Sequence, residues 1–429
     1  MTAPGAAPGP PLRRGPRPLL LHLTLAMLKS SVSVSASQTL SGAWTDWSEA
    51  AAEQAPLLVE AVQRASPNDA ETFSRAVLME ALRQDRELIA GIAAYRRHPW
   101  RRDLPDPPAL WEEGGSRLLD FGGEGVPLML VPSLVNRASV LDLAPQHSMA
   151  RFLAGHGRRV LLLDWGWPGE VERRFTLTDY IAGRLERALV AAGQPVVLAG
   201  YCMGGLLAVA AAQRRPELMA GLAALATPWD FHAADPARAR AVADLSGLLE
   251  PMMALADTLP VDLLQTLFAL LDPFGVAAKY RSFARLDPAS ERARLFVALE
   301  DWLNDGVPLA APVARECLGG WYGANTPARG EWRVAGLPVT PAALDLPAFV
   351  AVPGRDRIVP DVSARPLASL IRGAVLHAPL SGHIGMVAGS NAEAALWRPL
   401  LEWLRSVASR QLSVVRGRSS VVRKRGRQK

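Results

Sequence analysis

The chain of 429 residues lacks several features that would define its class. It has only two cysteines, which cannot make a disulfide framework and suit a reducing compartment where a thiol stays reactive. No apolar run approaches the length of a membrane span, and no cluster has metal-ligand spacing, so no cofactor is expected. With 49% hydrophobic and 21% charged residues, the composition fits a folded protein of one large or two smaller domains.

Acidic residues are absent from the C-terminal end of the chain, and this explains the net charge of +6. Residues 416–429 hold seven basic side chains, and without them the net charge would be −1. The simplest interpretation is a disordered, solubilising tail over residues 408–429. The alternative is contact with nucleic acid, phospholipid or another anionic surface. The first interpretation is preferred, so no nucleic-acid partner is expected.

The N-terminal part shows no strand pattern. Residues 1–39 are expected to be an N-terminal segment, disordered where Pro, Gly and Ala dominate. Within it the apolar run 19–28 follows three arginines and could belong to a signal peptide, but a helix that packs on the main domain or on a partner is preferred. Residues 40–110 are predicted to be helical, since apolar side chains recur at helical spacing from residue 66 onward.

From about residue 117, short apolar runs alternate with helical patterns. The predicted strands are 128–131, 160–163, 196–199, 221–226, 348–352 and 375–378, and the predicted helices are 148–154, 178–192, 245–271, 291–304 and 392–407. Such alternation predicts an α/β fold with a mostly parallel, doubly wound sheet over residues 111–407. The alternation stops at about 228–330, which predicts a helical insertion placed to cap a site at the sheet edge.

The stretch Gly200-Tyr201-Cys202-Met203-Gly204-Gly205 joins one predicted strand to a helix. Gly-x-nucleophile-x-Gly in this setting is typical of the nucleophile elbow of the α/β-hydrolase fold. Cys202 stands where esterases carry serine, and a thiol attacks thioesters readily, so the residue indicates a reaction class as well as a fold. An inert buried thiol would leave the elbow glycines without a purpose. Cys317 lies in the insertion and is expected to be structural.

Two further side chains follow later strands and complete a candidate triad. Asp356 comes after strand 348–352 and His383 after strand 375–378, so both are expected at the carboxyl edge of the sheet with Cys202. His383 would accept the thiol proton, and Asp356 would fix the imidazole tautomer. The rival residues that the sequence leaves open are His377 as the base, and Asp345 and Asp361 as the acid.

Backbone N–H groups are expected to stabilise the oxyanion that forms during acyl transfer. The Met203 N–H follows the nucleophile directly and would be one donor. A second should come from the loop 133–135 after strand 128–131, and Leu134 is the candidate chosen within it.

Together these residues resemble the polyhydroxyalkanoate synthases. The elbow around Cys202 is similar to that family's cysteine-bearing lipase box, and the segments around Asp356 and His383 resemble its aspartate and histidine motifs. The resemblance covers roughly residues 117–407. Softer matches are Pro132–Asn136, Leu141–Leu143, Asp164–Gly166, Thr227–Phe231, Trp302 and Asn304-Asp305.

The resemblance implies polymerisation of 3-hydroxyacyl-CoA thioesters through an acyl-cysteine at Cys202, with release of CoA. By the same resemblance His383 would activate the thiol and the attacking 3-hydroxyl, Asp356 would support it, and the insertion would screen the thiol. The expected partners are the acyl-CoA and the growing polyester chain. The expected location is the cytoplasm or the surface of a polymer granule.

Two departures from the family pattern concern the form of the enzyme. The N-terminal region is short beside that of the single-subunit synthases, and residues 385–389 are closer to the short forms that work with a partner subunit. A second synthase subunit and a homodimer therefore both stay open. The alternative functions are a cysteine-dependent esterase, thioesterase or lactone hydrolase, and a non-catalytic granule-associated homologue.

Overall fold

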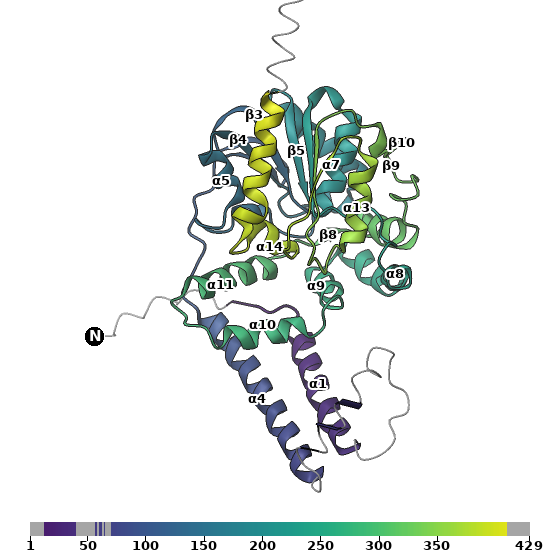
Figure 1. Cartoon of the computed structure of the whole chain (residues 1–429). Coiled ribbons are helices and arrows are strands. Elements are labelled where there is room, and N and C mark those ends of the chain that lie inside the picture. Colours follow the sequence, from purple (N-terminus) through teal and green to yellow (C-terminus); the bar gives the residue numbers. More distant parts are fainter. Residues whose placement is uncertain (1–12, 40–55, 58–59, 62–63, 65–69, 410–429) are drawn as a thin grey trace, which may run out of the picture. The chain divides into compact units, whose positions relative to one another are not determined.

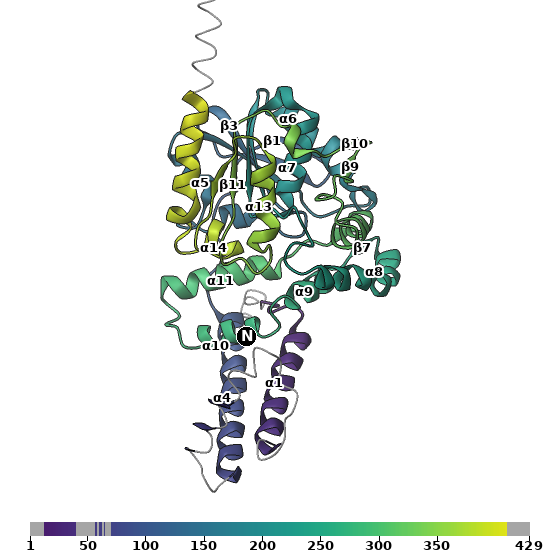
Figure 2. The ribbon, with the colours of Figure 1, turned by 45° about the vertical axis from the view of Figure 1, so that its right-hand side comes forward.

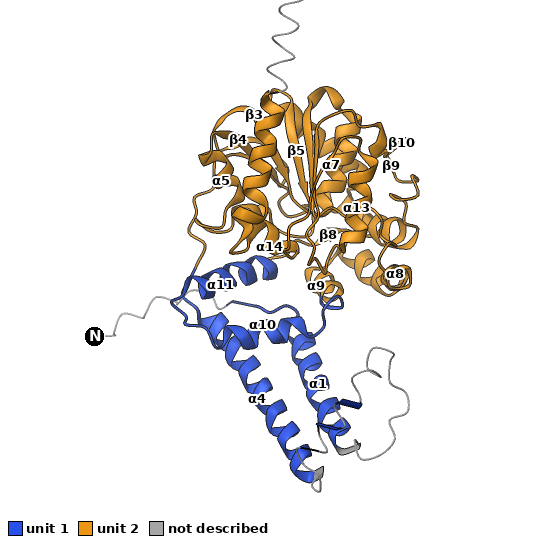
Figure 3. Cartoon of the chain, viewed as in Figure 1, with its two compact units in different colours: residues 1–100, 269–304 blue, residues 101–268, 305–429 orange. Residues whose placement is uncertain are grey.

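The computed structural model describes residues 13–39, 56–57, 60–61, 64 and 70–409. The chain divides into two compact units, coloured separately in Figure 3. The smaller unit combines residues 1–100 with 269–304, and the larger combines 101–268 with 305–429. Residues 269–304 of the predicted insertion therefore group with the N-terminal helices. The predicted disorder of residues 1–12 and of the basic tail from 410 onward falls outside the described residues.

The described residues of the larger unit form an eight-stranded sheet in the order β1-β2-β4-β3-β5-β6-β11-β12, of which β3, β4 and β5 are labelled in Figure 1. The strands β4, β3, β5, β6, β11 and β12 run parallel to one another, whereas β2 pairs antiparallel with both β1 and β4. The predicted mostly parallel α/β fold is confirmed. The bounds are β1 Ala109–Glu113, β2 Ser116–Asp120, β3 Glu124–Val131, β4 Arg158–Asp164, β5 Val196–Tyr201, β6 Met219–Leu225, β11 Ala348–Ala351 and β12 Val375–His377.

Helices cover both faces of this sheet. In Figure 1, α5 and the C-terminal helix lie to one side of β5, and α7 and α13 lie to the other; Figure 2 again shows α5 and α7 on opposite sides of the sheet. Strand β5 is buried along its whole length, as a parallel strand covered on both faces should be. The bounds are α5 Met149–Gly155, η3 Asp179–Leu185, α6 Glu186–Ala191, α7 Met203–Arg214, α13 Asp361–Leu370, α14 His383–Ala388 and η7 Glu393–Trp397, after which the chain stays helical to residue 409.

The β1–β2 hairpin was not predicted from the sequence. Its turn contains Gly114 with a φ of +56°, and β1 is largely exposed at the edge of the sheet. An exposed edge strand needs no apolar run, so the periodicity that marks buried strands is missing there. The short antiparallel pair β7–β8 (Thr258–Leu259 with Leu309–Ala310) and the hairpin β9–β10 (Arg333–Val334 with Leu337–Pro338) were missed as well.

The predicted helix 245–271 is wrong in its bounds. Helix α8 (Pro236–Ala256) starts earlier, because the Asp235 side chain caps it by accepting hydrogen bonds from two backbone N–H groups. The chain then breaks at Asp257, whose φ is +54°, and resumes as α9 (Val261–Ala269) after Pro260. The insertion continues in the larger unit with α12 (Ala311–Arg315) and the π-helix η5 (Glu316–Gly323).

The smaller unit is helical in its described part. It comprises α1 (Leu19–Thr39), α4 (Ala70–Arg97), α10 (Gly275–Phe283) and α11 (Glu291–Asn304). Its core gathers aromatic and aliphatic side chains from these helices, including Leu88, Tyr95, Tyr280, Phe283 and Val297. Within the N-terminal segment 1–39, residues 19–39 form a helix that packs on α4, which agrees with the helix preferred for the apolar run 19–28. Helix α4 agrees with the helical region predicted at 40–110, but it ends at Arg97 and β1 already starts at Ala109; most of residues 40–69 lie outside the described part.

Helix α1 also bears on the membrane question. Its stretch Leu19–Ser37 has a mean hydropathy of 1.4 and is long and apolar enough to cross a membrane by length and composition. The expectation that no run approaches that length was too strong. One such helix near the N-terminus is weak evidence for a membrane span, since core helices and signal sequences have the same properties.

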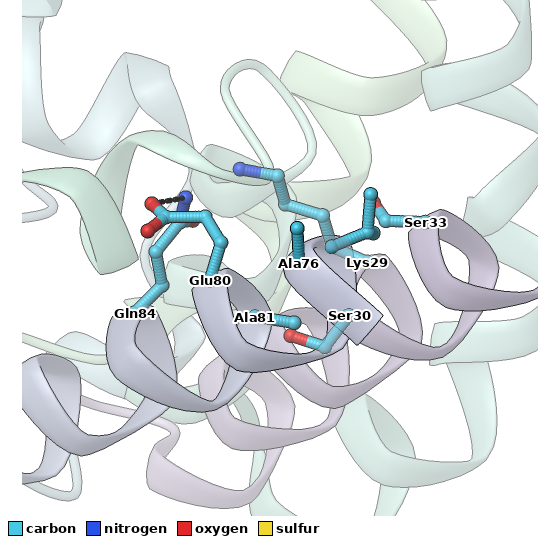
Figure 4. Close-up of a pocket in the computed structure, with 8 residues that line it drawn as sticks. Lys29, Ser30, Ser33, Ala76, Glu80, Ala81 and Gln84 are labelled. Atoms are coloured by element: carbon cyan, nitrogen blue, oxygen red, sulfur yellow. Dashed lines mark hydrogen bonds between the residues drawn. The ribbon is translucent and has the colours of Figure 1, made fainter. Parts of the chain in front are cut away.

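A pocket between α1 and α4 is lined by small and polar side chains, with Gln84 donating to Glu80 (2.9 Å; Figure 4).

Candidate active site

Cys202 occupies a sharp turn between β5 and α7. Its φ of +55° and ψ of −127° lie in a region that non-glycine residues rarely adopt, which costs on the order of 1–3 kcal/mol. The surrounding backbone holds this conformation: the Cys202 N–H donates to the Leu225 carbonyl of β6 (2.8 Å), and its own carbonyl accepts from Gly205 (2.9 Å). The predicted elbow geometry is present, with the nucleophile candidate at its apex.

The two glycines after Cys202 are required by close contacts. A Cβ on Gly204 would lie 2.1 Å from the Val131 carbonyl oxygen, and one on Gly205 would lie 1.8 Å from Thr227 Oγ1. Helix α7 therefore starts pressed against the ends of β3 and β6. This contact sets Met203, the first residue of the helix, beside the loop that follows β3.

These contacts predict different outcomes for two alanine substitutions. Gly205→Ala should lower the free energy of unfolding by about 1–3 kcal/mol, and Thr227→Ala in the same chain should recover part of it, since the clash is with a side chain. Gly204→Ala should lose at least as much with no such recovery, because it meets backbone oxygens. Denaturant unfolding of the four variants measures this, with Thr227→Ala alone as the control. Equal losses with and without Thr227→Ala would contradict the contact.

The loop after β3 is fixed from two sides. The Trp165 indole N–H at the end of β4 donates to the Pro132 carbonyl (3.0 Å), and the Val307 N–H donates to the Val135 carbonyl (3.1 Å). Leu134, buried between these two points, was the candidate second oxyanion donor. Its role and that of the Met203 N–H remain predictions, and the structure brings their segments together.

Asp356 and His383 meet as the sequence predicts. His383 Nδ1 lies 2.6 Å from Asp356 Oδ2, and the two side chains are 7% and 0% exposed. The other carboxylate oxygen accepts from the N–H groups of Ile358 and Val359 (2.8 and 2.9 Å), so both oxygens are used. Since a carboxylate only accepts, Nδ1 must carry a proton and donate it. The second imidazole nitrogen is then left for Cys202.

The electrostatics of His383 link it to both partners. Burial lowers the pKa of His383, but the charge of Cys202, the hydrogen bonds with Asp356 and Cys202, and the charge of Asp356 outweigh burial and raise it to about 10. Both partners therefore favour the charged form of the imidazole. A cationic neighbour of this kind favours the thiolate, which is the form of a cysteine that attacks an acyl carbon.

This coupling predicts how the pKa of His383 responds to substitution. Cys202→Ala should lower it, because the largest favourable charge is removed while burial stays. In the unsubstituted chain the raised pKa stabilises the fold fully below about pH 6.5, and this contribution should fade as pH rises through about 10. NMR titration of the imidazole carbons measures the pKa, with Cys317→Ala as control, and denaturant unfolding across this pH range measures the contribution to stability. An unchanged His383 titration in Cys202→Ala would contradict the coupling.

Tyr201 is a site residue that sequence reasoning missed. Its ring centroid lies 5.1 Å from that of His383, and its hydroxyl donates to the His383 backbone carbonyl (3.3 Å). Burial and the charges of Cys202 and Asp356 raise the pKa of Tyr201 well above its usual range, so it stays neutral. It holds His383 in place. The available signal was its position next to the nucleophile in the elbow motif.

The rival residues serve other contacts. His377 contacts the Ala395 carbonyl through Nε2 (2.6 Å) and stacks on Phe349. Asp361 and Asp345 have 41% and 92% exposed side chains, paired with arginines. Cys317 is buried in η5, and burial raises the pKa of its thiol. Within the described residues, no three His, Cys, Asp or Glu side chains gather where they could hold a metal.

Comparison with known proteins defines the class first. The family model described as alpha/beta hydrolase fold matches residues 126–389, and the chain belongs to this family. Its curated relatives include the "Poly(3-hydroxyalkanoate) polymerase subunit PhaC" of Haloferax mediterranei, 28% identical over 68% of this chain and 62% of the relative, and that of Allochromatium vinosum, 27% identical over 65% and 80%. The resemblance to the polyhydroxyalkanoate synthases is thereby confirmed.

The matches cover different shares of the relatives' own length. The chain spans less than two thirds of the length of the Haloferax mediterranei protein. A solved thermophilic esterase from Thermogutta terrifontis aligns with 71% of this chain and 98% of its own, at 19% identity and a TM-score of 0.40.

Proposed function

We propose that this chain is an acyltransferase that polymerises 3-hydroxyacyl-CoA thioesters into a polyhydroxyalkanoate and releases CoA. The observation that carries the proposal is a cysteine, rather than a serine, at the apex of the elbow, next to a buried His383–Asp356 pair. The named activity of the curated relatives supports the same conclusion. A thiol nucleophile suits a thioester, because the acyl-cysteine it forms is itself a thioester and transfers its acyl group readily.

Acylation is the first step. His383 takes the Cys202 proton, and the Sγ attacks the carbonyl carbon of the acyl-CoA, giving a tetrahedral oxyanion. The N–H groups of Met203 and Leu134 would donate to this oxygen. When the carbon–sulfur bond to CoA breaks, the imidazolium returns its proton to the leaving thiolate. The products are free CoA and an acyl-cysteine.

Chain growth is the second step. The 3-hydroxyl of another acyl group loses its proton to His383 as its oxygen attacks the acyl-cysteine carbonyl. Collapse of the intermediate breaks the bond to Cys202, and the sulfur recovers the proton. One ester bond forms in each cycle. Asp356 keeps the imidazole oriented and offsets its charge in both steps.

The proposal extends to the setting of the enzyme. We expect it in the cytoplasm or on a polymer granule, acting as a homodimer or with a second subunit, as the word subunit in the relatives' names suggests. We propose that residues 111–407 form the catalytic part and that the insertion 228–330 covers the Cys202 thiol.

The test is an assay of the purified full chain with 3-hydroxybutyryl-CoA, following CoA release and the acyl product. Polymer with CoA release would support a synthase. Free 3-hydroxybutyrate alone, even with the second synthase subunit of a relative supplied, would instead indicate a hydrolase that resolves the same acyl-enzyme with water. No CoA release from any acyl-CoA would favour a non-catalytic role.

A further inference from the structure

The segment after β6 lies at the same edge of the sheet as Cys202. The Cys202 N–H donates to Leu225, the last residue of β6, and Thr227 contacts the elbow at Gly205. Ala226 between them has a φ of +48°, which turns the chain sharply at this point. Residues 228–232 therefore directly follow a segment that contacts the elbow.

Hydrogen bonds fasten the end of η5 to this segment. Asn325 accepts from the Phe231 N–H (3.0 Å) through Oδ1 and donates to Asp230 (2.8 Å) through Nδ2. His232 Nε2 contacts the Tyr322 carbonyl at 2.7 Å, so that nitrogen carries the proton. Two segments about 90 residues apart in the chain are thus held together by three hydrogen bonds.

Aromatic rings form a wall at this junction. The Phe231 ring stacks on Trp321 with centroids 5.7 Å apart, and meets Tyr322 edge-on at 5.0 Å. Trp321 is buried, whereas Tyr322 is partly exposed. The described residues offer the Tyr322 hydroxyl no hydrogen-bond partner. A polar group left open in an otherwise apolar wall is the arrangement typical of ligand sites.

The Tyr322 hydroxyl is also electrostatically linked to the nucleophile. Burial and the charges of Cys202 and Cys317 raise the pKa of Tyr322, so the group is neutral across the working pH range. A neutral phenol both donates and accepts hydrogen bonds.

We propose that Tyr322 is a specificity residue, whose hydroxyl binds the 3-oxygen of the acyl group held on Cys202 while Phe231 contacts its hydrocarbon part. This inference rests on the proposed function. The 3-oxygen is a hydroxyl in the first acyl group and an ester oxygen in the growing chain, and a phenol O–H can donate to either. Tyr322 would therefore let the site favour 3-hydroxyacyl thioesters over plain acyl thioesters.

The test compares two thioesters of equal length, 3-hydroxybutyryl-CoA and butyryl-CoA, the second of which lacks the hydroxyl. Single-turnover acylation is followed by CoA release and by the intact mass of the protein. The full chain should acylate faster with the hydroxy substrate. Tyr322→Phe should reduce that preference about tenfold, by slowing the hydroxy substrate and leaving butyryl-CoA unchanged.

Tyr180→Phe is the matched control, since Tyr180 is a buried tyrosine of the same unit that packs against Trp165 and Phe175. It should leave the preference unchanged. Equal slowing of both thioesters in Tyr322→Phe, or an unaltered preference, would overturn the role of Tyr322 while the proposed function stands. No acylation of the unsubstituted chain by either thioester would remove the proposed function and this inference with it.

Discussion

Cys202→Ala should lower the rate of CoA release from 3-hydroxybutyryl-CoA at least about 10⁴-fold and abolish the acyl adduct seen by mass spectrometry. The expected loss is large because the elbow presents one side chain to the substrate, and its backbone conformation serves that side chain alone. Alanine keeps the turn but has no atom that can bond to the acyl group. Binding and the oxyanion donors would account for any residual rate.

Cys317→Ala is the control for this experiment. It removes the other thiol of the chain, which is buried in η5 and whose pKa is raised by burial and by the charge of Glu316. A protonated, enclosed thiol is a poor nucleophile, so this variant should keep the rate of the unsubstituted chain. An adduct mapped to Cys317, or turnover that survives Cys202→Ala, would refute the assignment of the nucleophile.

Much of the larger unit could be predicted because its signals are local. Strand β5 is a continuous apolar run, and the elbow glycines next to it are dictated by close contacts that leave no room for a Cβ. Asp356 and His383 could be proposed from their positions just after strands, since the carboxyl ends of parallel strands share one edge. The structure places the two side chains in direct contact, as that argument requires.

The remaining features depend on contacts between distant residues. The segment after β6 contacts η5 through the stacking of Phe231 on Trp321 and the hydrogen bond between His232 and the Tyr322 carbonyl. No sequence motif indicates that these residues lie together. The grouping of residues 269–304 with the N-terminal helices could not be predicted for the same reason. The apolar faces of the helices in 269–304 are equally compatible with packing inside the predicted insertion. The periodicity of a helix shows that one face is buried, but it does not identify the neighbour.

Asp356→Asn should lower the rate of CoA release by about 10⁴-fold while the fold is retained. Oδ1 of Asp356 accepts from two backbone N–H groups, so the amide oxygen of asparagine should take that place. The amide nitrogen would then face His383 Nδ1 and donate to it. This forces the proton onto Nε2, the nitrogen that has to accept the Cys202 proton. The substitution should therefore leave the imidazole in the tautomer that cannot act as a base.

The two rival carboxylates supply matched controls for this substitution. Asp361→Asn and Asp345→Asn make the same chemical change at exposed positions that pair with Arg365 and Arg372. Exposed pairs contribute only about 0–1 kcal/mol, so both variants should keep the rate and the stability of the unsubstituted chain. A loss of rate in either variant that matches the loss in Asp356→Asn would reassign the acid.

In Asp356→Asn the NMR titration should also show a lowered His383 pKa, since two of the contributions that raise it are lost. A pKa that stays near 10 would mean that Cys202 alone stabilises the imidazolium.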